Sequence, residues 1–118
     1  MPRNMSFIMT TPQFRARTKT VTRRFGWWFL KPGDVVMGVE RSRGLKKGET
    51  VTRLGLIRIV SVKSEPASAI IRYPRPQEEL RREGFPNMEA EAFVAMLIKA
   101  NGKPGGEAVN RIAFEYLD

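Results

Sequence analysis

Hydrophobic and polar residues alternate along several short stretches of the chain, which is the pattern expected of strands with one buried face. Four stretches show it: residues 5–9, 35–40, 51–63 and 109–117. In the third stretch the alternation shifts near Gly55 and Arg58. Because an extra residue in a strand reverses which side chains face the core, the shift predicts a β-bulge at Gly55. Such bulges help a small sheet to curl into a barrel.

A helical spacing occurs near the C-terminal end of the chain. Four apolar residues recur there at positions i, i+3, i+4 and i+7: Phe93, Met96, Leu97 and Ala100. This spacing places their side chains on one face of a helix. We expect Asn87 to cap the start of that helix and Asn101-Gly102 to end it.

The remaining stretches carry weaker patterns. Thr11-Pro12 combines a capping residue with a proline suited to the first helical position, so we expect a short helix from there to about Arg17. Residues 18–25 are rich in β-branched side chains and fit a strand or an extended loop. Residues 66–88 contain four prolines, which predicts a long connection with at most one helical turn near 77–82.

Strands and helices do not alternate regularly along the chain, which argues against a doubly wound parallel sheet. The order favours an α+β fold, with a small β-barrel of about five strands and two or three helices packed around it. The length of 118 residues suits one domain that spans residues 1–118.

Composition limits the chemistry that this chain can perform. It has no histidine and no cysteine, which excludes histidine-based catalytic triads, disulfides and zinc sites with the usual ligands. Acidic residues do not cluster as in a calcium loop, so we expect no metal and no cofactor. Because no apolar run approaches the length of a membrane span, we expect no membrane association. The lack of cysteine favours a cytoplasmic protein, which we expect to be a monomer.

Positive charge is concentrated in the N-terminal third. The net charge is +9, and the first acidic residue is Asp34. Seven basic residues precede it: Arg3, Arg15, Arg17, Lys19, Arg23, Arg24 and Lys31. A folded chain is expected to carry these charges as a surface patch, which would attract polyanions. The alternative is a solvated surface that only keeps the protein soluble.

The segment Lys19-Thr20-Val21-Thr22-Arg23-Arg24 lies at the centre of this basic third. In an extended chain Lys19 and Arg23 share one face, while Thr20, Thr22 and Arg24 share the other. A twist or a bulge can still bring Lys19 and Thr22 towards one cleft. Arginine forks and threonine hydroxyls suit phosphate and sugar oxygens, so the segment predicts contacts with RNA or a nucleotide. The alternative is a strand whose charges are merely solvated.

Two further groups of residues extend this prediction. Four aromatic residues follow the basic segment: Phe25, Trp27, Trp28 and Phe29. Exposed aromatic rings beside basic residues stack on unpaired bases, but such clusters more often belong to a core. We expect at least two of the four in the core and consider Trp27 a candidate ligand contact. Lys46 and Lys47 fit either a solvated loop or an extension of a phosphate track.

Four motifs in order along the chain resemble the ASCH domain, a PUA-like β-barrel family associated with RNA. They are residues 18–24, residues 30–34, Glu83-Gly84-Phe85 and residues 109–116. The phage and prophage members look most similar, since they also carry Gly26-Trp27 and the loop of residues 44–49. The resemblance spans nearly the whole chain. It implies a PUA-like barrel with a ligand cleft that is lined by residues 19–24 and closed by residues 83–85.

The resemblance also implies an alternative activity. Family members that remove the acyl group of acetylated cytidine use a lysine, a threonine and a glutamate at positions that match Lys19, Thr22 and Glu83. In that chemistry a neutral lysine takes the threonine proton, the alkoxide attacks the amide carbonyl, and the carboxyl group passes a proton to the leaving amine. Without the resemblance, Glu83 is one more surface acid. Ribonuclease-like cleavage and a phage-derived protein-interaction module are further alternatives.

The function predicted from the sequence is recognition of single-stranded RNA or a nucleobase-containing ligand in a basic cleft. If the protein is an enzyme, its catalytic residues are Lys19, Thr22 and Glu83. The predicted ligand contacts are Arg17, Lys19, Thr20, Thr22, Arg23, Arg24, Trp27, Lys46, Lys47, Glu83, Gly84 and Phe85.

Overall fold

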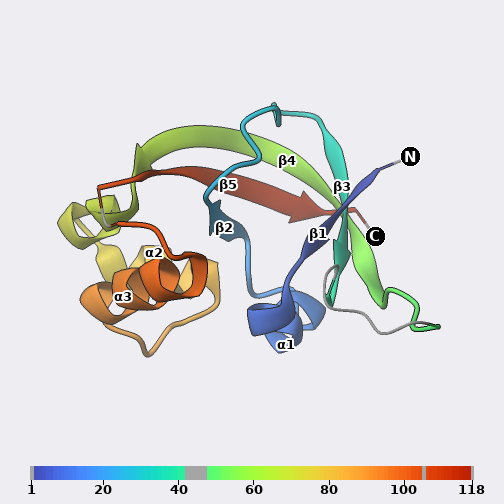
Figure 1. Ribbon diagram of the computed structural model, residues 1–118, viewed down its shortest axis with the longest axis horizontal. Helices are drawn as coiled ribbons and strands as arrows, with labels where there is room; N and C mark the ends of the chain where they lie inside the picture. Colours follow the sequence, from blue (N-terminus) through green and yellow to red (C-terminus); the bar gives the residue numbers. More distant parts are fainter. Residues whose placement is uncertain (1, 42–47, 105, 118) are drawn as a thin grey trace.

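The sheet of this protein combines strands from both ends of the chain. A computed structural model describes residues 2–41, 48–104 and 106–117. In these ranges five strands form the sheet: β1 (Arg3–Ser6), β2 (Val21–Arg24), β3 (Val35–Val39), β4 (Arg53–Pro66) and β5 (Ala108–Tyr116). Their order is β1-β3-β4-β5-β2, with β1 parallel to β3 and the other neighbours antiparallel. The long strands β4 and β5 arch over the helices, so the sheet curls into a half-barrel (Figure 1). The predicted α+β class is confirmed.

Two bulges on β4 allow this curl. Gly38 of β3 lies opposite Gly55, but the next residue, Val39, lies opposite Arg53, so one residue of β4 is unpaired there. Gly55 has a φ of +152°, which a side chain would disfavour. A second register shift against β5 leaves Val60 without a partner. The bulge predicted at Gly55 is confirmed, and the second shift lies two residues beyond Arg58.

The helices lie on the concave side of the arch (Figure 1). They are α1 (Thr11–Arg15), α2 (Pro76–Glu83) and α3 (Ala90–Asn101), together with two 3₁₀ helices, η1 (Ile8–Thr10) and η2 (Ala67–Arg72). In Figure 1, α2 and α3 lie beneath the C-terminal end of β4, while α1 lies beneath the part of the sheet near β1. The space between α3 and η1 is where the candidate site forms.

The prediction for residues 66–88 is wrong in its main point, because this stretch contains two helices rather than one long connection. Pro66 ends β4, and η2 starts directly after it. Pro76 stands in the first turn of α2, where a missing N–H removes no intrahelical hydrogen bond. Gly84 then ends α2 in the left-handed conformation, with a φ of +99°. The prolines therefore mark helix boundaries instead of breaking helices.

The predicted ends of several other elements shift by a few residues. Helix α3 begins at Ala90 with Glu89 as its cap, so the assignment of Asn87 as the cap is wrong; Gly102 ends the helix as expected. The first strand occupies residues 3–6 rather than 5–9, because the chain turns into η1 at Ile8. Helix α1 begins at Thr11 and ends at Arg15 rather than at about Arg17.

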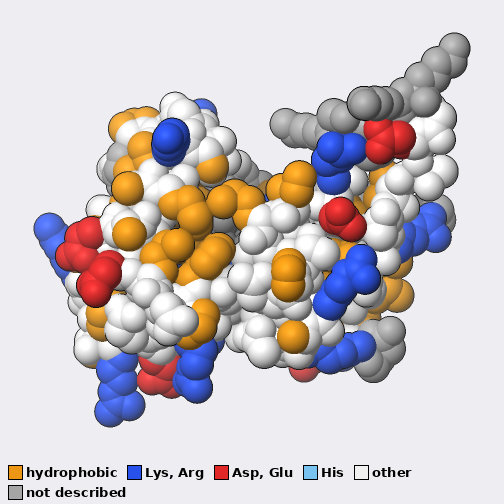
Figure 2. Space-filling model, turned by 90° about the horizontal axis from the view of Figure 1, so that it is seen from below, with side chains coloured by type: hydrophobic (Ala, Val, Ile, Leu, Met, Phe, Trp, Pro, Cys, Tyr) orange, Lys and Arg blue, Asp and Glu red, His pale blue; other side chains and the backbone are white. Residues whose placement is uncertain are grey.

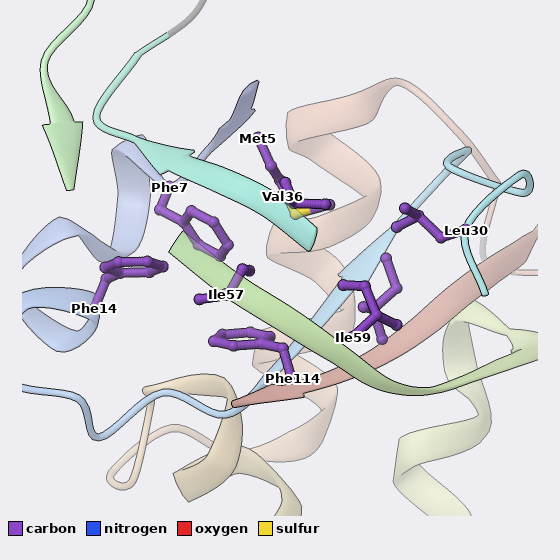
Figure 3. Close-up of a cluster of buried hydrophobic side chains, with 9 residues drawn as sticks. Met5, Phe7, Phe14, Leu30, Val36, Ile57, Ile59 and Phe114 are labelled. Carbon is purple, nitrogen blue, oxygen red and sulfur yellow. The ribbon is translucent and has the colours of Figure 1, made fainter. Parts of the chain in front are cut away.

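Two hydrophobic clusters make up the core. The first lies beneath β1, β3 and the N-terminal half of β4 (Figure 3): Met5, Phe7, Phe14, Leu30, Val36, Ile57, Ile59, Ile112 and Phe114. The second packs η2, α2 and α3 together: Ala67, Ile70, Leu80, Ala90, Phe93, Val94, Leu97 and Val109. Strand β5 contributes to both, since Val109 belongs to the second cluster and Phe114 to the first. The candidate site opens between the two clusters.

Candidate functional site

A cavity of about 250 Å³ lies between the two hydrophobic clusters. Its lining includes apolar residues of both clusters, among them Phe7 from the first and Phe93 from the second. Figure 2, which views the molecule from the side of the helices, shows hydrophobic side chains gathered in the hollow between its two lobes. The lining also includes the polar residues Lys19, Thr22, Arg23, Arg24 and Glu83. We call this space the Lys19 cavity.

The side chains of Lys19 and Glu83 meet inside this cavity. Lys19 stands just before β2 and is only 3% exposed. Its Nζ donates to the backbone carbonyl of Glu83 at 2.7 Å and to Glu83 Oε1 at 3.1 Å. Burial lowers the pKa of the Lys19 ammonium below its ordinary value of 10.5; Glu83 opposes this shift, and the guanidinium of Arg24 adds to it.

Arg23 is held by three carboxylates from two elements. Its Nη1 donates to Glu83 Oε2 at 2.8 Å, its Nη2 to Glu79 Oε2 at 2.7 Å, and its Nε to Glu65 Oε2 at 3.2 Å. Burial alone would lower the pKa of Arg23, but Glu83 and the other two carboxylates raise it. Each of the three guanidinium nitrogens thus donates to a carboxylate, and Arg23 has a structural role in holding α2 against β2 and β4.

Glu79 connects Arg23 to β5. The antiparallel register places Arg111 of β5 directly opposite Arg23 of β2, a pairing of like charges that would be unfavourable alone. The Glu79 carboxylate bonds to both guanidinium groups. Burial would raise the pKa of Glu79, but its bonds to Arg111 and Arg23 lower it to about 2. Glu79 therefore stays ionised and offsets the repulsion between the two arginines.

Thr22 and Arg24, which both line the cavity, are joined by a hydrogen bond. Arg24 donates from Nε to Thr22 Oγ1 at 3.1 Å and from Nη2 to the Ser6 carbonyl at 2.6 Å. Its guanidinium also lies over the ring of Phe7, 4.9 Å from the ring centre. Burial lowers the pKa of Arg24 to about 10, so the group remains charged at neutral pH. Among the described residues no carboxylate lies within ion-pair distance of Arg24.

The buried part of this network contains two cations, Lys19 and Arg23, and three carboxylates, Glu65, Glu79 and Glu83. The other two cations, Arg24 and Arg111, are partly buried; Arg111 bonds Glu79, whereas Arg24 bonds Thr22. Burial of a charge is costly, and the cost is relieved when the group gives up a proton or gains a partner of opposite charge. Lysine is the only cation among the four that can become neutral near physiological pH. Lys19 is thus suited to accept a proton or to attract a negatively charged group.

The structure brings together six of the residues that the sequence nominated. Lys19, Thr22, Arg23, Arg24, Glu83 and Phe85 all line the Lys19 cavity. Glu83 lies beside residues of the segment 19–24 in this cavity, although 59 residues separate Glu83 from Arg24 in the chain. Phe85 contributes its ring, which also contacts Phe93 at a centroid distance of 5.9 Å.

The other nominated residues lie elsewhere. Thr20 uses its backbone to bond Arg82 and Phe114. Gly84 ends α2, and its carbonyl accepts a hydrogen bond from Gln13. Arg17 is exposed, and its guanidinium lies 5.0 Å from the centre of the Tyr116 ring. None of these three residues lines the Lys19 cavity, and Lys46 and Lys47 fall outside the described residues.

Two of the four aromatic residues between positions 25 and 29 pack inward, as expected. Phe25 packs against the second cluster and Trp27 against the first, whereas Trp28 and Phe29 are more than half exposed. Trp27 adopts a positive φ of 60°, and its carbonyl accepts a hydrogen bond from Asn110 at 3.0 Å. Trp27 lies outside the lining of the Lys19 cavity.

The expectation that the N-terminal charges form one surface patch is wrong. Lys19 and Arg23 are buried, and both are neutralised by acids from α2. Arg15 and Lys31 pair at the surface with Glu40 and Asp34. Charge segregation along the sequence does not persist in space, because the later acidic residues fold back onto the basic segment.

Four polar residues of the network were missed by sequence reasoning: Glu65, Tyr73, Glu79 and Arg111. Tyr73 donates its hydroxyl proton to Glu65, and burial raises its pKa. The spacing of Glu79 and Glu83, four residues apart, would have identified two carboxylates on one helix face. The four prolines of residues 66–88 obscure that pattern, because they favour a connection with at most one helical turn.

Metal-binding clusters and membrane-spanning helices are both absent from the described residues. No group of three acidic side chains there is placed to hold a metal ion. No helix in the same ranges is long and apolar enough to cross a membrane. Comparison of the chain with protein-family models, curated proteins and solved structures finds no match. The function is therefore argued from the geometry of the Lys19 cavity.

Proposed function

We propose that the Lys19 cavity binds a nucleobase-containing small molecule and that Lys19, Thr22 and Glu83 hydrolyse an acyl amide on it, as in acetylated cytidine. The observation that carries this proposal is the hydrogen bond from the partly buried Arg24 to the hydroxyl oxygen of Thr22. A guanidinium that donates to this oxygen stabilises the alkoxide that a nucleophilic threonine must form. Arginine thus favours ionisation of Thr22 beside a buried lysine.

The size and lining of the cavity support a small ligand. A volume of about 250 Å³ suits a single base and its substituent better than a run of nucleotides. Binding sites for small molecules typically combine apolar and aromatic walls with a few polar groups. Here Phe7, Phe85 and Phe93 supply the aromatic surface, and Lys19, Arg24 and Glu83 are among the polar groups of the same lining.

The proposed reaction has two stages. Neutral Lys19 takes the proton of Thr22, and the alkoxide attacks the amide carbonyl of the bound ligand. The tetrahedral intermediate collapses, the bond to the exocyclic nitrogen breaks, and the leaving amine receives the proton from Lys19 through Glu83. Water then attacks the acyl ester on Thr22 with Lys19 as base, which releases the carboxylic acid and restores the hydroxyl. Arg24, which bonds Thr22 Oγ1, stabilises the Thr22 alkoxide when it forms in the first stage and when it leaves in the second.

Binding without hydrolysis is a second candidate function. The observation that favours it is the pair of hydrogen bonds from Lys19 Nζ to Glu83. These bonds are suited to a charged ammonium, and a charged Lys19 cannot accept the proton of Thr22. The cavity would then hold a nucleobase-containing ligand through Lys19 and Arg24 alone.

The test is release of cytidine from cytidine acetylated on its exocyclic amine, followed by chromatography. We expect turnover by the wild type and loss of turnover, by about 100-fold or more, in Thr22→Val. The matched control is Thr20→Val, which removes a neighbouring hydroxyl that does not line the cavity and should retain full activity. No turnover, together with calorimetric binding of the nucleoside, would support the second candidate. Neither turnover nor binding would overturn both.

A further inference from the structure

A second cavity, of about 550 Å³, lies at the other end of the ion-pair network. Its lining includes five cationic side chains: Lys63, Arg72, Arg75, Arg82 and Arg111. They come from β4, η2, the residue before α2, α2 itself and β5, so the fold brings them together from distant parts of the sequence. We call this space the Arg72 cavity. The sequence motifs did not nominate any of these residues.

The acids that line the Arg72 cavity do not balance these charges. Glu78 and Glu79 are the acidic residues of the lining. Glu79 is buried and already bonded to Arg23 as well as Arg111. Glu78 pairs with Arg82 at 3.1 Å and lies only 3.9 Å from Arg75. The lining therefore keeps an excess of three positive charges.

Arg72 and Lys63 are the cations in this lining that are best placed to take a new partner. Arg72 is exposed at the end of η2, and within the described ranges no carboxylate lies within ion-pair distance of it. Lys63 is 66% exposed and reaches Glu65 only at 3.9 Å. An incoming anion would meet these two groups without first breaking a short ion pair.

We infer that the Arg72 cavity binds phosphate groups. Four of its five cations are arginines, whose planar forks donate pairs of parallel hydrogen bonds to phosphate oxygens. When cations that have few acidic partners bind a polyanion, counterions are released from the polyanion, and this release favours binding. The cavity volume exceeds that of one phosphate, so it admits neighbouring phosphates of one ligand. A free nucleotide and a single-stranded nucleic acid both offer such groups.

This inference does not rest on the proposed hydrolysis, since the two cavities have different linings. The residues chosen for the test are Arg72 and Arg75, which are exposed and make no contact with the Lys19 cavity. A failure of phosphate binding would leave turnover of the acetylated nucleoside untouched. A failure of turnover would likewise leave phosphate binding untouched.

The experiment uses two probes, each at several salt concentrations. Calorimetry measures inorganic tripolyphosphate, and fluorescence anisotropy measures a labelled 12-nucleotide oligouridylate. We compare the wild type with Arg72→Ala/Arg75→Ala and with the matched control Arg53→Ala/Arg58→Ala. The control removes the same charge from exposed positions on β4 that do not line the cavity.

Whichever probe the wild type binds, we expect its affinity for Arg72→Ala/Arg75→Ala to be at least about tenfold weaker. The affinity for the control variant should change by no more than about twofold. For the oligonucleotide, the slope of log affinity against log salt should fall by about 1.4, because two phosphate contacts are lost. Binding of tripolyphosphate alone assigns the cavity to free phosphates, and binding of the oligonucleotide alone assigns it to a nucleic-acid backbone. Binding of neither probe, or equal losses in the two variants, would overturn the inference.

Discussion

The residue that decides between catalysis and binding is Lys19. As a base it must be neutral, and burial lowers its pKa below 10.5. We therefore expect the turnover rate to rise with pH and to level off below 10.5, as the proton leaves the ammonium. Lys19→Arg keeps the charge but cannot lose it near neutral pH, so this variant should be inactive at every pH. pH–rate profiles of the wild type and of Lys19→Arg test these two expectations. An active Lys19→Arg variant would contradict the role of Lys19 as base.

Glu79 is the residue on which the stability of the network most depends. Glu79→Gln removes the charge that offsets Arg23 and Arg111, so we expect a loss of about 3–5 kcal/mol in the free energy of unfolding. The matched control is Glu78→Gln, which changes a more exposed neighbour and should cost about 1 kcal/mol or less. Urea denaturation compares the two variants, and equal effects would contradict a special role for Glu79.

Glu79 should also make the stability of the protein depend on pH. The pKa of Glu79 is about 2 in the folded protein, compared with an ordinary value of 4.5. Between these values the unfolded chain binds a proton that the folded protein does not, so stability falls as pH decreases from 4.5 towards 2. We expect Glu79→Gln to lose this contribution, which should make its stability depend less on pH in that range.

The sequence identified part of the site at the residue scale. Lys19, Thr22 and Glu83 were nominated together through the resemblance to a known family, and they line one cavity. Charge counting alone led to a wrong conclusion, because it treated Lys19 and Arg23 as solvated. Lys19 pairs with Glu83 of α2, and Arg23 pairs with Glu83 and Glu79 of α2 and with Glu65 of β4. No local pattern around either residue indicates which distant acids will reach it.

Among the elements, strands were easier to predict than helices. The alternation of residues 35–40, 51–63 and 109–117 placed β3, β4 and β5, because a sheet with one buried face requires a period of two. The bulge at Gly55 was visible as a shift in that period. Of helix α2, the sequence predicts at most one turn near residues 77–82, because the prolines suggest a connection, although Pro76 occupies a position where a helix accepts proline.

The packing of α1 against the sheet gives a prediction at this scale. A Cβ atom at Gly38 of β3 would lie 2.4 Å from Cζ of Phe14, whose ring is buried in the first cluster. We expect Gly38→Ala to destabilise the protein by about 1–3 kcal/mol, because the ring must shift within a packed core. Thermal unfolding measures this, with Gly106→Ala as control, since the space around Gly106 is open. An unchanged Gly38→Ala variant would contradict the packing described.

In the whole molecule, folding redistributes the charge that is segregated along the sequence. Two cations of the basic N-terminal segment, Lys19 and Arg23, become buried in the lining of the Lys19 cavity, where Glu83 of α2 pairs with both. Arginines from the middle of the chain and from β5 instead supply the excess of positive charge in the Arg72 cavity. Net charge alone indicates an affinity for anions, but it does not show where they bind.

The two cavities share one ion-pair network. Arg23 and Glu83 line the Lys19 cavity, Arg111 lines the Arg72 cavity, and Glu79 bonds to both arginines. The fold therefore presents a small, partly apolar site on one side and an open cationic site on the other. The first suits a nucleobase with an amide substituent, and the second suits phosphate groups.

The most direct test of the central claim is a single-turnover measurement with the protein in molar excess over acetylated cytidine. If Lys19, Thr22 and Glu83 form a hydrolytic site, the wild type and Thr20→Val will convert the substrate fully to cytidine and acetate. Thr22→Val will leave the substrate intact over the same period. Intact substrate after prolonged incubation with the wild type, or equal conversion by Thr22→Val, would contradict the claim.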